Sequence, residues 1–223
     1  MFIHWAGSGI GLLSVVDSHY WGRHLFRITP VEKEERSRGQ SLIVFAPEPG
    51  YFLPLPLLQH LRQSGTPLYE GYQFRKQSYR NRLFILSSTG IQSLSVPLQH
   101  PISGIRYKEI KIAYTELWQR RHLRAIATAY GKSPYFFYWR TELEDLYRQQ
   151  PVYLFEWNRL CLQLQSRMCR IPLPEFLDSA PEALRYEAFM PQLPEVQPYL
   201  QTFHDRLGFQ PGVSGLDLGL NGE

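Results

Sequence analysis

The chain contains little cysteine: among its 223 residues only Cys161 and Cys169 carry a thiol. They lie eight positions apart in a segment with helical periodicity, and the corresponding rise of about 12 Å is too long for a disulfide between them. The sequence therefore excludes a disulfide-stabilised secreted scaffold and predicts a reducing, cytoplasmic environment. Neither cysteine has a histidine or lysine beside it in sequence, so we interpret both as buried structural thiols.

Long apolar runs are also absent. No stretch approaches the ~20 apolar residues that a membrane-spanning helix needs. The most apolar early run, residues 10–16, has no basic region before it and no cleavage site after it, so we predict no signal peptide.

The sequence lacks the short motifs that mark several enzyme classes. It contains no GxSxG elbow, no HExxH, no CxxC pair and no GxxxxGK[ST] phosphate loop. The seven histidines are scattered, with no two at metal-ligand spacing on one helix. Nothing in the sequence indicates a metal ion or another cofactor.

The excess of positive charge is small. Lys and Arg number 24 against 20 Asp and Glu, which gives a net charge of +4 and a pI near 9.1. This excess favours acidic partners but is too small to indicate nucleic acid, and no basic tail or zinc-finger spacing is present. The phosphate or carboxylate of a small molecule is the commoner partner of a few clustered arginines.

The length and composition predict one soluble globular domain, with 43% hydrophobic and 20% charged residues. Residues 1–40 differ from the rest of the chain. Their glycines at positions 7, 9 and 11 imitate part of a dinucleotide loop, but only six residues precede them. We therefore predict a flexible N-terminal extension and linker over residues 1–40, followed by a domain over residues 41–223.

The first half of that domain has the patterns of a sheet. Apolar runs or two-residue alternation predict strands at residues 42–45, 68–74 and 105–113, and two more strands joined at Gly90. One helix interrupts them, because Pro54 and Pro56 suit a first helical turn and Gly65 suits a helix end.

The second half is helical. The pattern predicts a helix over residues 115–130, with Thr115 as N-cap and Gly131 as the stop. Two further helices follow, led by Pro134 and Pro151. We therefore predict an α+β fold in which a mixed, mostly antiparallel sheet in the N-terminal half packs against about three C-terminal helices.

One short window concentrates positive charge beside an aromatic ring and an amide. It contains Lys76, Tyr79, Arg80, Asn81 and Arg82, directly before an apolar strand. Guanidinium groups bind phosphates and carboxylates in a bidentate way, so this window predicts a site for an anion.

His122 is the most informative histidine. Helical spacing places it on one face with Trp118 and Ile126. It is therefore either a hydrogen-bonded core residue or a group that lines a pocket, and the sequence leaves both interpretations open.

Several short motifs occur in the same order as in a known family, the WbqC-like proteins, which the chain resembles over about residues 45–220. They are Tyr51-Phe52-Leu53-Pro54, Lys76-Gln77-Ser78-Tyr79-Arg80-Asn81-Arg82, Leu94-Ser95-Val96-Pro97, Trp118-Gln119-Arg120-Arg121-His122 and Ser133-Pro134-Tyr135-Phe136. The tail, Gly208-Phe209-Gln210-Pro211 with Leu216-Asp217-Leu218, resembles that of the branch common in Bacteroidetes.

The resemblance implies a function in surface polysaccharide biosynthesis, because the family is named from an O-antigen gene cluster. It also implies transfer of a glycine, aminoacyl or acyl group to an amino sugar, an activity ascribed to some members. In that hypothesis Lys76, Arg80 and Arg82 hold a phosphate or carboxylate, and Tyr79 and Trp118 stack on the ligand.

The same hypothesis assigns the chemistry to two side chains. Asn81 donates a hydrogen bond to the carbonyl oxygen, and His122 accepts the proton of the attacking amine. The alternative is a non-catalytic protein that binds a nucleotide sugar or another anionic small molecule through the same window.

Overall fold

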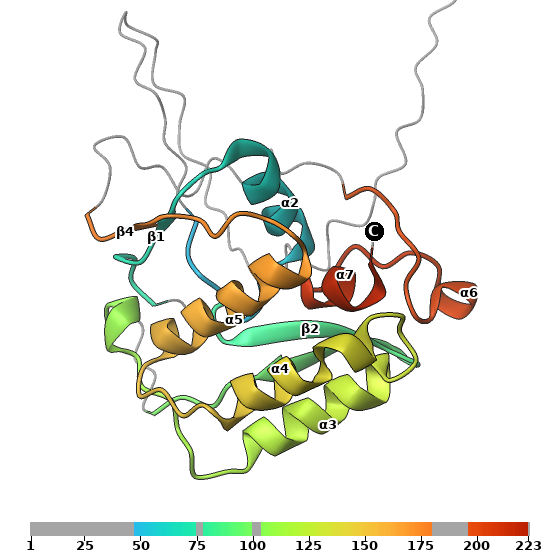
Figure 1. The fold of residues 1–223 in the computed structure, drawn as a ribbon. Helices are drawn as coiled ribbons and strands as arrows, with labels where there is room; N and C mark the ends of the chain where they lie inside the picture. Colours follow the sequence, from blue (N-terminus) through green and yellow to red (C-terminus); the bar gives the residue numbers. More distant parts are fainter. Residues whose placement is uncertain (1–46, 75–77, 100–103, 180–195, 223) are drawn as a thin grey trace, which may run out of the picture.

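The computed structural model describes residues 47–74, 78–99, 104–179 and 196–222 (Figure 1). The predicted extension over residues 1–40, the strand expected at 42–45 and Lys76 lie outside the described residues.

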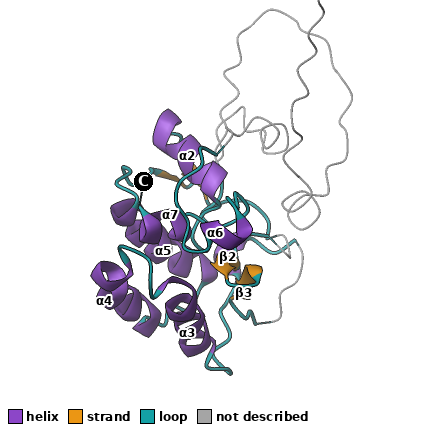
Figure 2. Cartoon of the chain, turned by 90° about the vertical axis from the view of Figure 1, so that its right-hand side faces the viewer, coloured by secondary structure: helices purple, strands orange, loops and turns teal. Residues whose placement is uncertain are grey.

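The first described helix begins and ends where its prolines and glycine predict. Helix α2 spans Leu55–Ser64, with Pro54 as its N-cap residue and a proline in its first turn. Gly65 ends it with φ of 62°, a left-handed conformation that glycine adopts without a steric penalty. The leucines of α2 face the core, and in both ribbon views α2 lies on the opposite side of the molecule from α3 and α4 (Figures 1 and 2).

The predicted hairpin is confirmed. Strand β2 (Arg82–Ser87) pairs antiparallel with β3 (Gly90–Ser95), in a register that runs from Arg82 opposite Ser95 to Ser87 opposite Gly90. Residues 83–86 of β2 are all buried, whereas β3 is largely exposed, so β2 is the strand that faces the core.

The expected single mixed sheet is wrong for the described residues, which form two separate two-stranded sheets. Besides the hairpin, β1 (Leu68–Tyr69) pairs in parallel with β4 (Phe176–Leu177). Only the first two residues of the strand predicted over 68–74 belong to β1.

The strand predicted over residues 105–113 is replaced by a 3-10 turn, η1 (Tyr107–Glu109), and isolated bridges. Ile110 and Ile112 are buried. The Tyr107 side chain is also fully buried, and its hydroxyl donates to the carbonyl of Pro49 at 3.1 Å. The segment folds around this inward-facing ring, so it does not extend along a neighbouring strand.

The three predicted C-terminal helices are present as α3 (Trp118–Tyr130), α4 (Phe136–Arg148) and α5 (Leu154–Met168). Gly131 ends α3 as expected, donating to the carbonyl of Ala127. The predicted N-cap Thr115 is wrong, because the helix begins after Leu117 without a side-chain cap. The α+β class is therefore confirmed, and helices dominate the C-terminal half.

Two short helices complete the described chain: α6 (His204–Leu207) and α7 (Leu216–Asn221). Every residue of α7 is buried, and α7 packs against α4, α5 and β2. Helix α7 is therefore part of the core.

The core is rich in aromatic side chains. Its largest fully buried members include Trp118, Trp157 and Tyr51. Cys161 and Cys169 are buried free thiols, as their spacing predicted. Within the described ranges, none of the helices has both the length and the hydropathy that a membrane crossing demands.

Candidate functional site: a basic cleft

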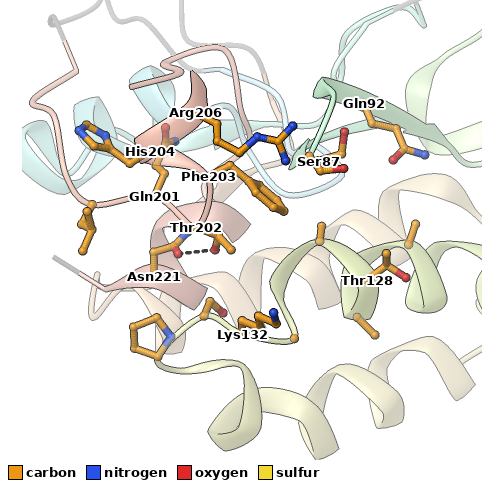
Figure 3. A pocket seen from close by; sticks show the side chains of 18 of the residues that line it. Ser87, Gln92, Thr128, Lys132, Gln201, Thr202, Phe203, His204, Arg206 and Asn221 are labelled. Atoms are coloured by element: carbon orange, nitrogen blue, oxygen red, sulfur yellow. Dashed lines mark hydrogen bonds between the residues drawn. The ribbon is translucent and has the colours of Figure 1, made fainter. Parts of the chain in front are cut away.

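An open cleft of about 1190 Å³ lies where the hairpin, the end of α3 and the segment around α6 meet. Figure 3 shows its side chains coming from these three parts of the chain: Ser87 and Gln92 from the hairpin, Thr128 from α3, and Phe203 and Arg206 from the α6 region. The hairpin lies between α6 and α3 in the side view as well (Figure 2). We call this hollow the basic cleft.

Cations predominate in the lining of the basic cleft. Arg121, Arg124, Lys132 and Arg206 line it, and Asp205 is the single carboxylate among the lining residues. Arg121 is paired with Glu116 outside the lining. Within the described ranges, Arg124, Lys132 and Arg206 form no ion pair, so no carboxylate of the described chain neutralises their charges.

Neutral hydrogen-bonding groups lie beside the cations. Gln201, Thr202 and Asn221 line one wall, and the Thr202 hydroxyl donates to Asn221 Oδ1 at 2.8 Å (Figure 3). The amides of Gln201 and Asn221 are buried and bonded within the fold. The exposed neutral groups of the cleft are those of Ser88, Gln92 and Thr128, whose hydroxyls and amide can bind groups such as sugar hydroxyls. The Phe203 ring adds an apolar surface to the wall that contains Thr202.

This wall is held from behind by Asp217 of α7. Its buried carboxylate accepts hydrogen bonds from the hydroxyls of Tyr130 and Tyr199, at 2.8 and 2.6 Å. It also accepts from the amides of Gln201 and Asn221, at 3.0 and 3.2 Å. Burial raises the pKa of Asp217 above its ordinary value, although these donors favour the charged form. Asp217 thus fixes two cleft residues from within the core.

Arg80 of the predicted anion window is buried in an ion pair with Glu48, and both side chains are 1% exposed. Its guanidinium lies over the rings of Phe74 and Tyr107, 5.9 and 5.7 Å from their centroids. Its carbonyl accepts a hydrogen bond from Asn158 at 2.7 Å. The charge of Arg80 is therefore matched inside the fold by a carboxylate.

The other described residues of the window also make internal contacts. Tyr79 is buried, and its hydroxyl donates to the carbonyl of Glu48 at 3.4 Å. Asn81 donates from Nδ2 to the carbonyl of Val96 at 3.3 Å, which joins the start of β2 to the end of β3. Arg82 is half-buried at the first position of β2.

His122 lies in an aromatic cluster with Trp118, Tyr51 and Tyr147. It is 6% exposed, and its Nδ1 is 3.0 Å from the Tyr51 hydroxyl, which also hydrogen-bonds the Tyr147 hydroxyl. Trp118 is fully buried, with its ring centroid 5.2 Å from that of His122. Burial, reinforced by the nearby Arg121, lowers the pKa of His122 to about 4. The imidazole is therefore neutral at neutral pH.

Tyr51 connects the window to His122. Its backbone N–H donates to the carbonyl of Tyr79 at 3.0 Å, while its hydroxyl contacts the imidazole. Tyr51 thus contacts the window through its backbone and His122 through its side chain. None of the described residues selected from the sequence lines the basic cleft.

Sequence reasoning missed the cations of the cleft and the partner of Arg80. One signal was available for the cations. Between Leu117 and Thr141 the charged residues are all Lys or Arg, and no Asp or Glu occurs. No comparable signal marks Glu48 or Arg206, because each acquires its role only through contacts between distant parts of the chain.

The comparison with protein families shows the family to which this chain belongs. The model of the WbqC-like protein family matches residues 44–182, which is more than half of the chain. The chain therefore belongs to the WbqC-like protein family. Searches of curated proteins and of solved structures gave no match. The family match ends before the tail at residues 208–218, so membership of the Bacteroidetes-type branch stays a proposal.

Proposed function

We propose that this protein binds an anionic small molecule, one that carries a phosphate or carboxylate, in the basic cleft. The observation that carries the proposal is the set of cations on the cleft, Arg124, Lys132 and Arg206, none of which has an acidic partner within the described ranges. Arginine and lysine are the usual ligands of phosphate and carboxylate groups. A cleft with this charge attracts such groups and repels cations.

The other lining groups indicate the rest of the ligand. Ser88, Gln92 and Thr128 offer exposed hydroxyl and amide groups, and Phe203 offers a ring. This combination suits a molecule with hydroxyl groups and a flat or ring-shaped part next to its charge. A nucleotide sugar has all three features. The volume of the cleft, about 1190 Å³, is somewhat above the roughly 300–1,000 Å³ typical of small-molecule sites.

A thermal unfolding experiment with chosen probes tests this proposal. Inorganic pyrophosphate and UDP-N-acetylglucosamine are expected to raise the Tm with increasing concentration, since a ligand that binds only the folded state stabilises it. Neutral N-acetylglucosamine at the same concentrations is expected to have a much smaller effect. Equal shifts with the neutral and charged probes, or no shift with either charged probe, would contradict the proposal.

A transferase is the second candidate, in which an acyl or aminoacyl group moves to an amino sugar during surface polysaccharide synthesis. The observation in its favour is the link through Tyr51 between the basic window and His122. The amine nitrogen would attack the carbonyl carbon, the amine proton would pass to His122, and the bond from that carbon to its leaving group would break.

Two features rank the transferase below the binding protein. With a pKa lowered to about 4, His122 is a weak proton acceptor at neutral pH, where bases with a pKa near the operating pH work best. The Asn81 amide already donates to Val96, so it would have to leave this bond to stabilise an oxyanion.

Turnover distinguishes the two candidates. Purified protein is incubated with acetyl-CoA and a UDP-linked amino sugar, and the acylated sugar is sought by mass spectrometry. The transferase predicts product with the wild type and none with His122→Gln of unchanged Tm. Binding of UDP-N-acetylglucosamine without product formation supports the binding protein.

A further inference from the structure

One buried tyrosine, Tyr130, connects the hairpin wall of the basic cleft to the turn that follows α3. It is the last residue of α3. Its hydroxyl accepts a hydrogen bond from the backbone N–H of Leu86 at 2.9 Å, directly before Ser87, which lines the cleft. Its backbone carbonyl accepts from the N–H and the hydroxyl of Ser133, both at 2.8 Å. These bonds hold the hairpin and the turn that carries Lys132 against the end of α3.

The Tyr130 hydroxyl also connects to the third wall of the cleft, through Asp217. It donates to Asp217 Oδ2 at 2.8 Å, and Oδ1 of the same carboxylate accepts from the amides of Gln201 and Asn221 at 3.0 and 3.2 Å. Asn221 Oδ1 in turn accepts from the Thr202 hydroxyl at 2.8 Å, the bond drawn in Figure 3. A continuous run of hydrogen bonds therefore joins the hairpin, α3 and the segment before α6 behind the cleft.

Neither Tyr130 nor Asp217 is placed to contact a ligand in the cleft. Both residues are 0% exposed, and neither lines the cleft. The Tyr130 hydroxyl donates its one proton to Asp217 and accepts from Leu86, so its bonds lie within the fold. Any effect of Tyr130 on ligand binding must therefore pass through the walls that it joins.

We propose that Tyr130, acting with Asp217, is a positioning residue of the basic cleft, which sets the affinity for an anionic ligand without contacting it. This inference rests on the function proposed above. Lys132 and Arg206 belong to different walls of the cleft (Figure 3). A ligand that contacts both binds more tightly when the walls are already held at the right separation, because binding then requires no ordering of the protein.

The variant Tyr130→Phe tests the proposal, because it removes the hydroxyl and keeps the ring. Phe84 and Ser214 hold the middle of β2 by two further bonds, at 2.8 and 3.1 Å, so the strand should stay in place. Isothermal titration with UDP-N-acetylglucosamine, at a temperature at which every variant is folded, should give a Kd about fivefold weaker than that of the wild type. In the free protein, amide hydrogen exchange should be faster over residues 87–92 and 201–206.

The matched control is Tyr107→Phe. Tyr107 is also fully buried, and its hydroxyl likewise donates one hydrogen bond, to the carbonyl of Pro49, and accepts one, from Asn158. It does not line the basic cleft. This variant should lose stability, as Tyr130→Phe does, but keep the wild-type Kd and the wild-type exchange rates in both wall segments. The comparison therefore separates a positioning role from a general loss of stability.

Arg206→Ala provides a second readout, since it removes a cation from the wall opposite the end of α3. We expect it to weaken binding about fivefold in the wild type but only about twofold in Tyr130→Phe, where the wall that carries Arg206 is no longer held in place. In Tyr107→Phe the loss should again be about fivefold. Equal losses in all three backgrounds would mean that Tyr130 does not position the walls.

Failure of this inference and failure of the proposed function give different results. If the wild type and Tyr130→Phe bound UDP-N-acetylglucosamine with the same Kd, the positioning role would be overturned and the function of the cleft would stand. If the wild type did not bind this probe or inorganic pyrophosphate, the proposed function would be contradicted, and the positioning role with it.

Discussion

Arg80 and Glu48 form an ion pair in the interior of the fold, with 1% of each side chain exposed. The pair joins the segment before Tyr51 to the turn that leads into β2. Tyr51 itself donates its backbone N–H to Tyr79, so two kinds of contact hold these segments together. One of the three cations that the sequence predicted to bind an anion thus has an internal partner.

Replacing one member of this pair should destabilise the fold strongly. We expect Arg80→Met to lower the free energy of unfolding by about 3–5 kcal/mol, because Glu48 would remain as an uncompensated buried charge. Combining it with Glu48→Leu should restore much of the loss, since a buried pair can often be replaced by apolar residues at little cost. Urea unfolding measures both. If Arg80→Met kept full stability and lost only affinity for UDP-N-acetylglucosamine, Arg80 would be a ligand-binding residue.

His122 should make stability depend on acid pH. Its pKa is lowered from 6.5 to about 4 on folding, so between these values the unfolded chain binds more protons than the folded one. The contribution of His122 is therefore fully present above pH 6.5 and is lost as the pH falls toward 4, by up to about 3 kcal/mol. Asp217, whose pKa is raised, has the opposite sign.

The comparison of wild type with His122→Gln isolates the histidine from Asp217. Urea unfolding at several pH values between 4 and 7 should show a steeper loss of stability for the wild type. Parallel curves for the two proteins would mean that His122 is as accessible to protons in the folded chain as in the unfolded one.

Asp217 should contribute both to the stability of the fold and to the positions of the residues that line the cleft. Asp217→Ala removes the carboxylate that accepts four hydrogen bonds, two of them from the amides of Gln201 and Asn221, which line the cleft. We expect a loss of at least about 3 kcal/mol, against about 1 kcal/mol for Tyr199→Phe, which removes a single donor. Equal losses in urea unfolding would show that Asp217 does not organise the network.

Local rules predicted the helix ends and the hairpin well. Gly65 and Gly90 lie where a helix ends and where two strands join, with positive φ values that glycine adopts without a steric penalty. The prediction of Thr115 as N-cap was wrong, because α3 begins only after Leu117. The local sequence does not distinguish a helix that begins after Thr115 from one that begins after Leu117.

The site was harder to predict because its parts are far apart in sequence. Arg80 meets a carboxylate 32 positions away, which no window of the sequence pairs with it. The basic cleft likewise needs Arg206 beside the hairpin, and this arrangement depends on α7 returning to the core. The helical spacing of His122 did indicate its aromatic neighbours, since Trp118 lies one turn before it on the same face.

Isothermal titration with UDP-N-acetylglucosamine tests the central claim most directly, by comparing the wild type with Arg124→Ala combined with Lys132→Ala. Both cations line the basic cleft and are exposed, so their removal should leave the fold intact. Lys111→Ala is the control, because it removes an exposed cation that does not line the cleft. We predict a Kd at least about tenfold weaker for the double variant, from the loss of two charge-assisted contacts, and an unchanged Kd for the control. The same Kd for all three proteins would contradict the account.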